Sequence, residues 1–162
     1  MIHVHTNLIT CINLVKLVVK DQIEEREDNM KVSHEVPTPH EYLELRKAAG
    51  LRAIDEDAAK TALNRSIFST VVRGEQSELI GMGRIIGDGG CFFQIVDIAV
   101  KPAGQNEELK KMIMNEITDY LRRHAPAGAE VIIMADVPSI GLYQTYGFDY
   151  TYPSSISLRK TC

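Results

Sequence analysis

Two segments near residues 38–63 have the spacing of apolar residues that is typical of helices. Thr38–Glu41 combines an N-cap hydroxyl, a proline at the first helical position and a glutamate three residues after the cap, which is a capping box. The apolar residues from Tyr42 to Ala49 keep helical spacing, and Gly50 is a typical C-terminal stop. A second short helix is expected from about Glu56 to Leu63, with Asp55 as its cap.

From Ile67 the period of the apolar positions changes from helical to alternating. Ile67–Arg73 is β-branched and aromatic, and a polar turn separates it from a returning strand at Leu79–Ile86. A second turn, which contains Asp88 and two glycines, leads into the apolar run Cys91–Val100. The pattern predicts three consecutive antiparallel strands.

Helical spacing then returns, with Asn106 as the expected cap, and ends at Ala125–Gly128. The next run, Glu130–Ala135, is nearly all apolar, which predicts a strand buried on both faces. Because it follows a crossover helix, this strand is expected to run parallel to the strand before that helix. A short helix around Ser139–Tyr146 and a last strand at Tyr150–Arg159 complete the predicted order.

These elements predict an α/β fold of mixed type. We expect a twisted mixed sheet with antiparallel N-terminal strands and a central parallel pair, flanked by helices. The 162 residues suit one domain. Residues 21–29 form a charge run just before Met30, so we expect residues 1–29 to be an extension outside the core and residues 30–162 to form the domain.

Composition narrows the function classes. A formal charge of −4 and a pI near 5.7 argue against nucleic acid as a partner, and the absence of any run of eighteen apolar residues argues against a membrane span. The cysteines, Cys11, Cys91 and Cys162, are few and far apart, which favours reduced thiols and a cytoplasmic protein. The pair His3 and His5 has no further ligands nearby, so we expect no metal. The sequence leaves the oligomeric state open, a homodimer included.

Three local patterns carry a resemblance to a known family. Val96–Pro102 reads Val-Asp-Ile-Ala-Val-Lys-Pro, Gln105 follows it, and Leu142–Phe148 reads Leu-Tyr-Gln-Thr-Tyr-Gly-Phe. Together with the order of elements, these patterns resemble the GNAT superfamily of N-acetyltransferases. The resemblance covers about Val32 to Lys160, and the Leu-Tyr-x-x-x-Gly-Phe pattern is its most specific part.

The resemblance implies acetyl transfer from acetyl-CoA to an amine of a small molecule. The strand Val96–Val100 would line the acyl-CoA cleft, and a backbone N–H near Ile98 would polarise the thioester carbonyl. Tyr143 would donate a proton to the departing thiolate. The base that accepts the amine proton is left open among Asp97, Asp136 and a bound water.

Just after Gln105, the sequence differs from the family pattern. The family continues with a glycine-rich stretch that lets backbone N–H groups approach the pyrophosphate. In the segment Asn106–Lys111, Glu108 and Lys110 stand at two glycine positions. We expect the carboxylates to weaken CoA binding and the lysines to offset part of this by turning toward the phosphates. The residues expected to hold the cofactor are Ile98, Val100, Gln105, Asn106, Lys110 and Lys111.

Three functions therefore stay open. The first is acetyl transfer with weakened CoA binding. The second is CoA-independent acid/base chemistry on a small molecule in the same cleft, such as a cyclisation, isomerisation or decarboxylation, and the third is a catalytically silent binding module. The role of Asp97 bears on this choice. Burying an unpaired carboxylate in an apolar strand is energetically unfavourable, so this residue needs either a function or a partner. It is either a catalytic acid or base in the cleft or a structural residue with buried partners.

Overall fold

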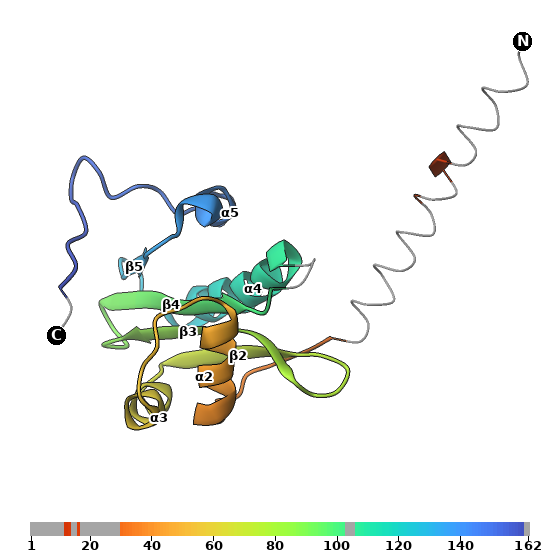
Figure 1. The fold of residues 1–162 in the computed structure, drawn as a ribbon. Coiled ribbons are helices and arrows are strands. Elements are labelled where there is room, and N and C mark those ends of the chain that lie inside the picture. The colour runs from red at the N-terminus through yellow and green to blue at the C-terminus, as the bar shows by residue number, and fades with distance from the viewer. Residues whose placement is uncertain (1–11, 14–15, 17–29, 103–105, 161–162) are drawn as a thin grey trace, which may run out of the picture.

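The computed structural model describes residues 12–13, 16, 30–102 and 106–160 (Figure 1). Most of residues 1–29 lie outside this part of the chain, so their expected role as an extension stays a prediction. The histidine pair at 3 and 5 and the expected cofactor residue Gln105 lie outside it as well. Within the described part of the chain, none of the helices has the length and apolar character needed to span a bilayer.

In the described part of the chain, five strands form one mixed sheet. They are β1 (Lys31–Ser33), β2 (Phe68–Arg73), β3 (Leu79–Gly87), β4 (Phe92–Val100) and β5 (Glu130–Ile133), in that spatial order. The pairs from β1 to β4 are antiparallel, whereas β4 and β5 are parallel. The predicted mixed α/β sheet with a parallel pair is confirmed, and β1 is an added strand that the sequence pattern did not reveal.

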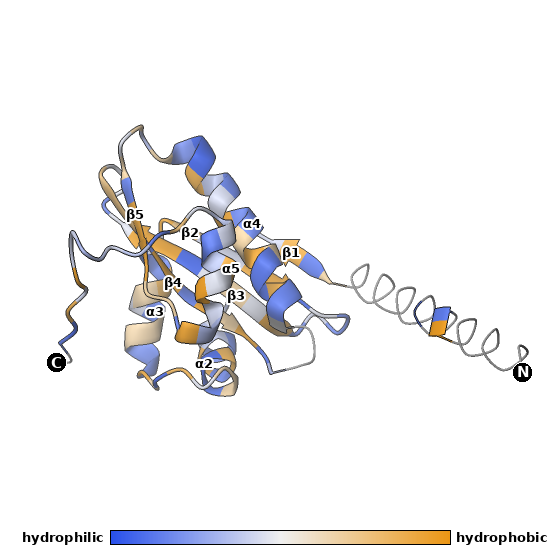
Figure 2. Cartoon of the chain, turned by 90° about the horizontal axis from the view of Figure 1, so that it is seen from above, coloured by the Kyte–Doolittle hydropathy of each residue, from blue (hydrophilic) through white to orange (hydrophobic). Residues whose placement is uncertain are grey.

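Helices cover both faces of the sheet (Figure 1). On one face, α2 (Pro39–Ala48) and α3 (Glu56–Asn64) pack through a core cluster that includes Tyr42 and Leu45. On the other face, α4 (Asn106–His124) buries its apolar side against β2, β3 and β4. Figure 2 shows that hydrophilic and hydrophobic residues are mixed along these helices, as expected for helices with one apolar side. A 3-10 turn and α5 (Ile140–Thr145) follow β5.

The predicted caps fix where α2 begins and ends. The Thr38 hydroxyl accepts a hydrogen bond from the Glu41 backbone N–H, and the Glu41 carboxylate accepts one from the Thr38 N–H at 2.9 Å, which confirms the capping box. Gly50 has φ of +69° and lets the Leu51 N–H reach back to the carbonyl of Arg46. This end of α2 places the Arg46 side chain over β4.

Two expectations about the C-terminal part are wrong. Tyr150–Arg159 forms no strand, and β5 is half-exposed instead of buried on both faces. The last segment does not pair with β5, which is therefore an edge strand, and the side chains of Glu130 and Ile132 lie on a face of β5 that is left exposed. Pro153, which has no N–H to donate to a ladder, interrupts the segment's alternating pattern.

Candidate functional site

A cavity opens where the two parallel strands separate. β4 and β5 pair from Phe92 with Glu130 as far as Ile95 with Ile133, and no pairing follows beyond that point. A cavity of about 450 Å³ occupies the opening. Four groups of residues line it. They are Arg46, Ala48, Ala49 and Leu51 at the end of α2; Ile95, Val96, Asp97, Ile98, Val100 and Pro102 along β4 and just beyond it; Ile133, Met134 and Asp136 at the end of β5 and beyond it; and Lys110 with Tyr143 from α4 and α5.

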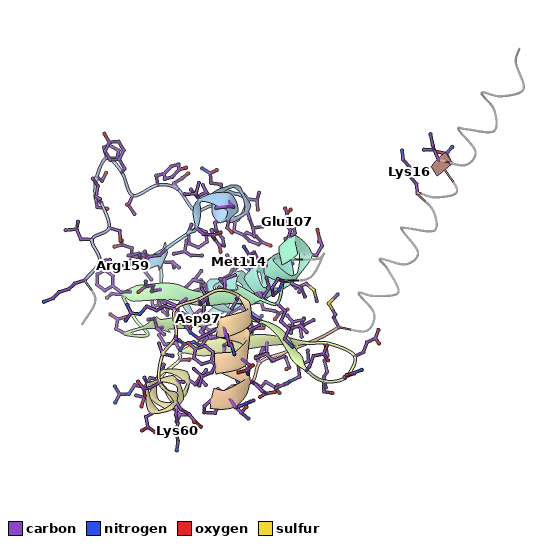
Figure 3. All side chains as sticks on the ribbon, in the orientation of Figure 1. Lys16, Lys60, Asp97, Glu107, Met114 and Arg159 are labelled. Atoms are coloured by element: carbon purple, nitrogen blue, oxygen red, sulfur yellow. The ribbon has the colours of Figure 1, made fainter. Side chains whose placement is uncertain are left out.

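A bulge in β4 shapes the wall of this cavity. The register between β3 and β4 passes from Arg84 opposite Val96 to Met82 opposite Ala99, so β4 contains an additional residue at this point. Asp97 has φ of +55°, a left-handed conformation in which Asp and Asn are enriched among non-glycine residues. The bulge turns Asp97 toward α2, and Figure 3 shows it beside the C-terminal end of that helix.

Asp97 is the centre of a charged group that we call the Asp97 cluster: Tyr42, Arg46, Arg84 and Asp97. Arg84 binds carboxylate oxygen Oδ2 through Nη2 at 2.5 Å and Nε at 2.9 Å. Arg46 binds the other oxygen, Oδ1, through Nη1, and the Tyr42 hydroxyl donates to Oδ2 at 2.6 Å. Burial, followed by this hydrogen bond to Asp97, raises the pKa of Tyr42, so its phenol stays protonated at neutral pH.

These contacts favour the structural role for Asp97 over the role of an acid or base. Both carboxylate oxygens are held by guanidinium groups, and only 10% of the side chain is exposed. The catalytic assignment of Asp97 stays a prediction. Sequence reasoning missed Arg46 and Arg84, although a costly lone carboxylate in an apolar strand was a signal that cationic partners must come from elsewhere in the chain.

Tyr143 lies where the cavity meets α5. Its side chain packs in the core formed with α4, with 5% of the residue exposed, and it also lines a second cavity of about 300 Å³ on the outer side of β5. Burial raises the pKa of Tyr143, the negative charge of Asp136 raises it further, and a hydrogen bond with Ser139 lowers it. The phenol is therefore protonated at neutral pH and available as a proton donor.

The two lysines near the start of α4 already have partners within the protein. The Lys110 ammonium donates to the Ser139 hydroxyl at 2.7 Å and lines the cavity beside Tyr143. The Lys111 ammonium lies 2.9 Å from a Glu108 oxygen and 3.8 Å from a Glu107 oxygen, and the Glu108 hydrogen bond is the main cause that raises its pKa. Figure 3 labels Glu107 at this end of α4.

The structure brings most of the predicted site residues to one cavity. Ile98, Val100, Lys110, Tyr143 and Asp97 all line it. Asn106 begins α4, while Gln105 lies outside the described residues and its expected role stays a prediction.

Comparisons with known proteins agree with this geometry. A family model described as the acetyltransferase (GNAT) domain matches residues 31–157. A protein of unknown function from meticillin-resistant Staphylococcus aureus, described as a probable acetyltransferase, is 36% identical over 82% of this chain and 99% of its own, with a TM-score of 0.77.

More distant structures share the fold. A GNAT-family acetyltransferase from Streptococcus pneumoniae is 18% identical over 82% of this chain and 97% of its own, with a TM-score of 0.66. A GNAT-family acetyltransferase from Brucella melitensis, solved in complex with acetyl-CoA, is 20% identical over 75% of this chain and 83% of its own, with a TM-score of 0.55. Among curated proteins, none matches the sequence. The family match and the 36% identical structure show that the chain belongs to the GNAT acetyltransferase family.

Proposed function

We propose that this protein transfers an acetyl group from acetyl-CoA to an amine of a small molecule. The observation that carries the proposal is the opening between β4 and β5, where the edge of β4 beyond Ile95 faces a cavity instead of a strand. A pantetheine chain can pair with such an exposed strand edge in the manner of an added strand. The Brucella melitensis protein of the same fold, solved with acetyl-CoA, supports this choice of cofactor.

The reaction needs an oxyanion donor, a proton donor and a proton acceptor. The amine nitrogen attacks the thioester carbonyl carbon, and a backbone N–H near Ile98 stabilises the oxyanion of the tetrahedral intermediate. As the carbon–sulfur bond breaks, the thiolate takes a proton from Tyr143, whose burial keeps it protonated at neutral pH. The amine loses its proton to Asp136 or to water, since both oxygens of Asp97 are occupied by arginines.

CoA binding is expected to be weak because of the residues that begin α4. Glu108 and Lys110 stand where the family pattern has glycines, and Glu108 adds a carboxylate where the pyrophosphate would lie. At about 6 Å, one such carboxylate would cost roughly 0.7 to 3 kcal/mol of binding free energy, depending on the effective dielectric constant. The Lys111 ammonium compensates part of this charge, because it lies within 4 Å of both Glu107 and Glu108.

Calorimetric titration with acetyl-CoA tests the proposal directly. The natural chain is expected to bind weakly, and the double variant Glu108→Gly, Lys110→Gly is expected to bind at least about tenfold more tightly. The control is Glu108→Gln, Lys110→Gln, which removes the charges but leaves both side chains in place. If the control also binds acetyl-CoA more tightly than the natural chain, the weak binding is caused by charge. If only the glycine variant binds more tightly, the weak binding is caused by side chains that block access to the backbone. If neither variant nor the natural chain binds acetyl-CoA, the acetyltransferase proposal is refuted.

Tyr143→Phe separates catalysis from silent binding. In a thiol-release assay with acetyl-CoA, we expect this substitution to lower kcat by about 100-fold or more, because it removes the proton donor and preserves the packing of the ring. An unchanged rate would remove Tyr143 from the mechanism. CoA binding without any thiol release by the natural chain, across a panel of amines, would identify a binding module.

A further inference from the structure

The Asp97 cluster contains more positive than negative charge. Arg46 and Arg84 share one carboxylate, and among the residues that the structure describes all ion pairs of these two arginines lead to Asp97. The fourth member, Tyr42, is a neutral phenol. The side chains of Arg46 and Arg84 are only 13% and 6% exposed. Within the described part of the chain, one positive charge of the cluster therefore has no ionised partner, which is an unfavourable arrangement unless an anion joins it.

The two arginines of the cluster differ in their surroundings, and only Arg46 is among the described residues that line the cavity. The remaining guanidinium donors of Arg84 bind the Ala62 carbonyl and the Ser66 hydroxyl, both at 2.9 Å, on the side of α3. Arg46 lines the cavity, and its Nε is buried with no hydrogen-bond partner in the described part of the chain. Arg46 Nη2 donates to the carbonyl of Arg52, which holds the guanidinium in place at the end of α2.

The two ends of the cavity differ in charge. At the end near α5, the cavity is lined by one cation, Lys110, and one anion, Asp136, whose charge acts on Tyr143. At the end near α2, the cluster leaves one positive charge next to the small and apolar side chains of Ala48 and Leu51. A ligand that extends between the two ends would place an anionic group at Arg46 and an amine near Asp136.

We propose that the acceptor is a small amino-acid-like molecule whose carboxylate binds Arg46 while its amine lies toward the opening between β4 and β5. A carboxylate is a monoanion, so it matches the single excess charge of the cluster. Nη1 of Arg46 is occupied by Asp97 and Tyr42, so a carboxylate oxygen would accept from the N–H of Nη2 that the Arg52 carbonyl leaves over. The cavity volume of about 450 Å³ must hold the acetylated arm of the cofactor as well, which limits the acceptor to a small molecule. This inference rests on the proposed acetyl transfer.

Matched pairs of acceptors test the proposal. Each amino acid in a panel is compared with its own carboxamide, which keeps the amine and side chain but has no negative charge. In the thiol-release assay, the natural protein is expected to prefer the carboxylate form by about 10- to 100-fold in kcat/KM, because a hydrogen bond to a charged partner is worth that much. The preference is expected to fall to near unity in Arg46→Gln and to persist in part in Arg46→Lys.

The exposed Arg65 provides the control for net charge. Arg65→Gln changes the net charge as Arg46→Gln does and is expected to keep the carboxylate preference. Arg46→Gln is expected to fold, because it leaves Asp97 and Arg84 as a balanced pair. Equal rates for carboxylates and carboxamides with the natural protein, in the presence of thiol release, would overturn the acceptor proposal and leave acetyl transfer intact.

A thermal-shift measurement decides the question even without turnover. Small amino acids are expected to raise the unfolding temperature of the natural protein, whereas their carboxamides and the variant Arg46→Gln are expected to give no shift. Carboxylate-specific stabilisation without acetyl-CoA binding would support the Arg46 site and refute the acetyltransferase proposal. The absence of any such stabilisation, at concentrations up to those used in the kinetic assay, would overturn the Arg46 site.

Discussion

Replacing Asp97 with Asn removes the only carboxylate of the Asp97 cluster while changing little else. Asn has nearly the same shape and is, like Asp, enriched in the left-handed conformation that the φ of +55° requires, so the bulge in β4 is expected to persist. The two buried guanidiniums of Arg46 and Arg84 then lie close together without a counter-charge. Removing one partner of a buried ion pair costs about 3 to 5 kcal/mol, which we take as the expected loss in the free energy of unfolding.

Thermal unfolding followed by circular dichroism at neutral pH measures this loss. In a domain of this size, each kcal/mol corresponds to roughly 3 to 5 °C, so the midpoint is expected to fall by about 10 to 25 °C. In Arg46→Gln, the added substitution Asp97→Asn is expected to cost less, because one guanidinium is already gone. A loss below about 1 kcal/mol for Asp97→Asn, or an equal loss in both backgrounds, would show that the cluster is not held by charge.

Other regions give simpler tests by thermal or urea unfolding. Gly83→Ala would place Cβ 2.5 Å from Ile113 Cγ2, and such overpacking is expected to lower the free energy of unfolding by about 1 to 3 kcal/mol. The control is Gly141→Ala, whose Cβ would meet nothing within 4 Å and which is expected to be neutral or stabilising. Hydrogen bonding to Arg73 lowers the pKa of Glu41 to about 2, so this partly exposed pair is expected to add about 1 kcal/mol of stability above pH 4.5 that is lost as the pH falls toward 2. Arg73→Met is expected to flatten that pH dependence, and an unchanged profile would contradict the assignment. A chain that starts at Met30, which packs on the core just before β1, is expected to keep its unfolding midpoint; a lower midpoint would place residues 1–29 in the fold.

The sequence by itself determined the elements whose signals are local. The capping box of α2, the Asp55 cap of α3 and the change of period at the start of β2 each depend on residues within a few positions of one another, and all three occur in the structure. The parallel direction of β5 also followed from the sequence, because a helix links it to β4. The opening beside Asp97 was expected from the resemblance, and the place where pairing stops at Ile95 confirms it.

The C-terminal segment shows where local pattern fails. Alternating apolar residues indicate that a segment can form a strand, but a strand exists only where a neighbouring edge accepts its hydrogen bonds. Tyr152, Ile156 and Leu158 remain exposed because no such pairing forms in this structure. The same missing pairing leaves β5 at the edge of the sheet.

Only the tertiary structure decided the electrostatics of the cavity. Asp97 receives its two cations from positions 51 and 13 residues away, one on α2 and one on β3, and no periodicity links those positions. Lys110 likewise meets Ser139 across 29 residues and two elements. Charges buried in a common site interact through space and not along the chain, so which arginine lines the cavity is determined only when the helices have packed on the sheet.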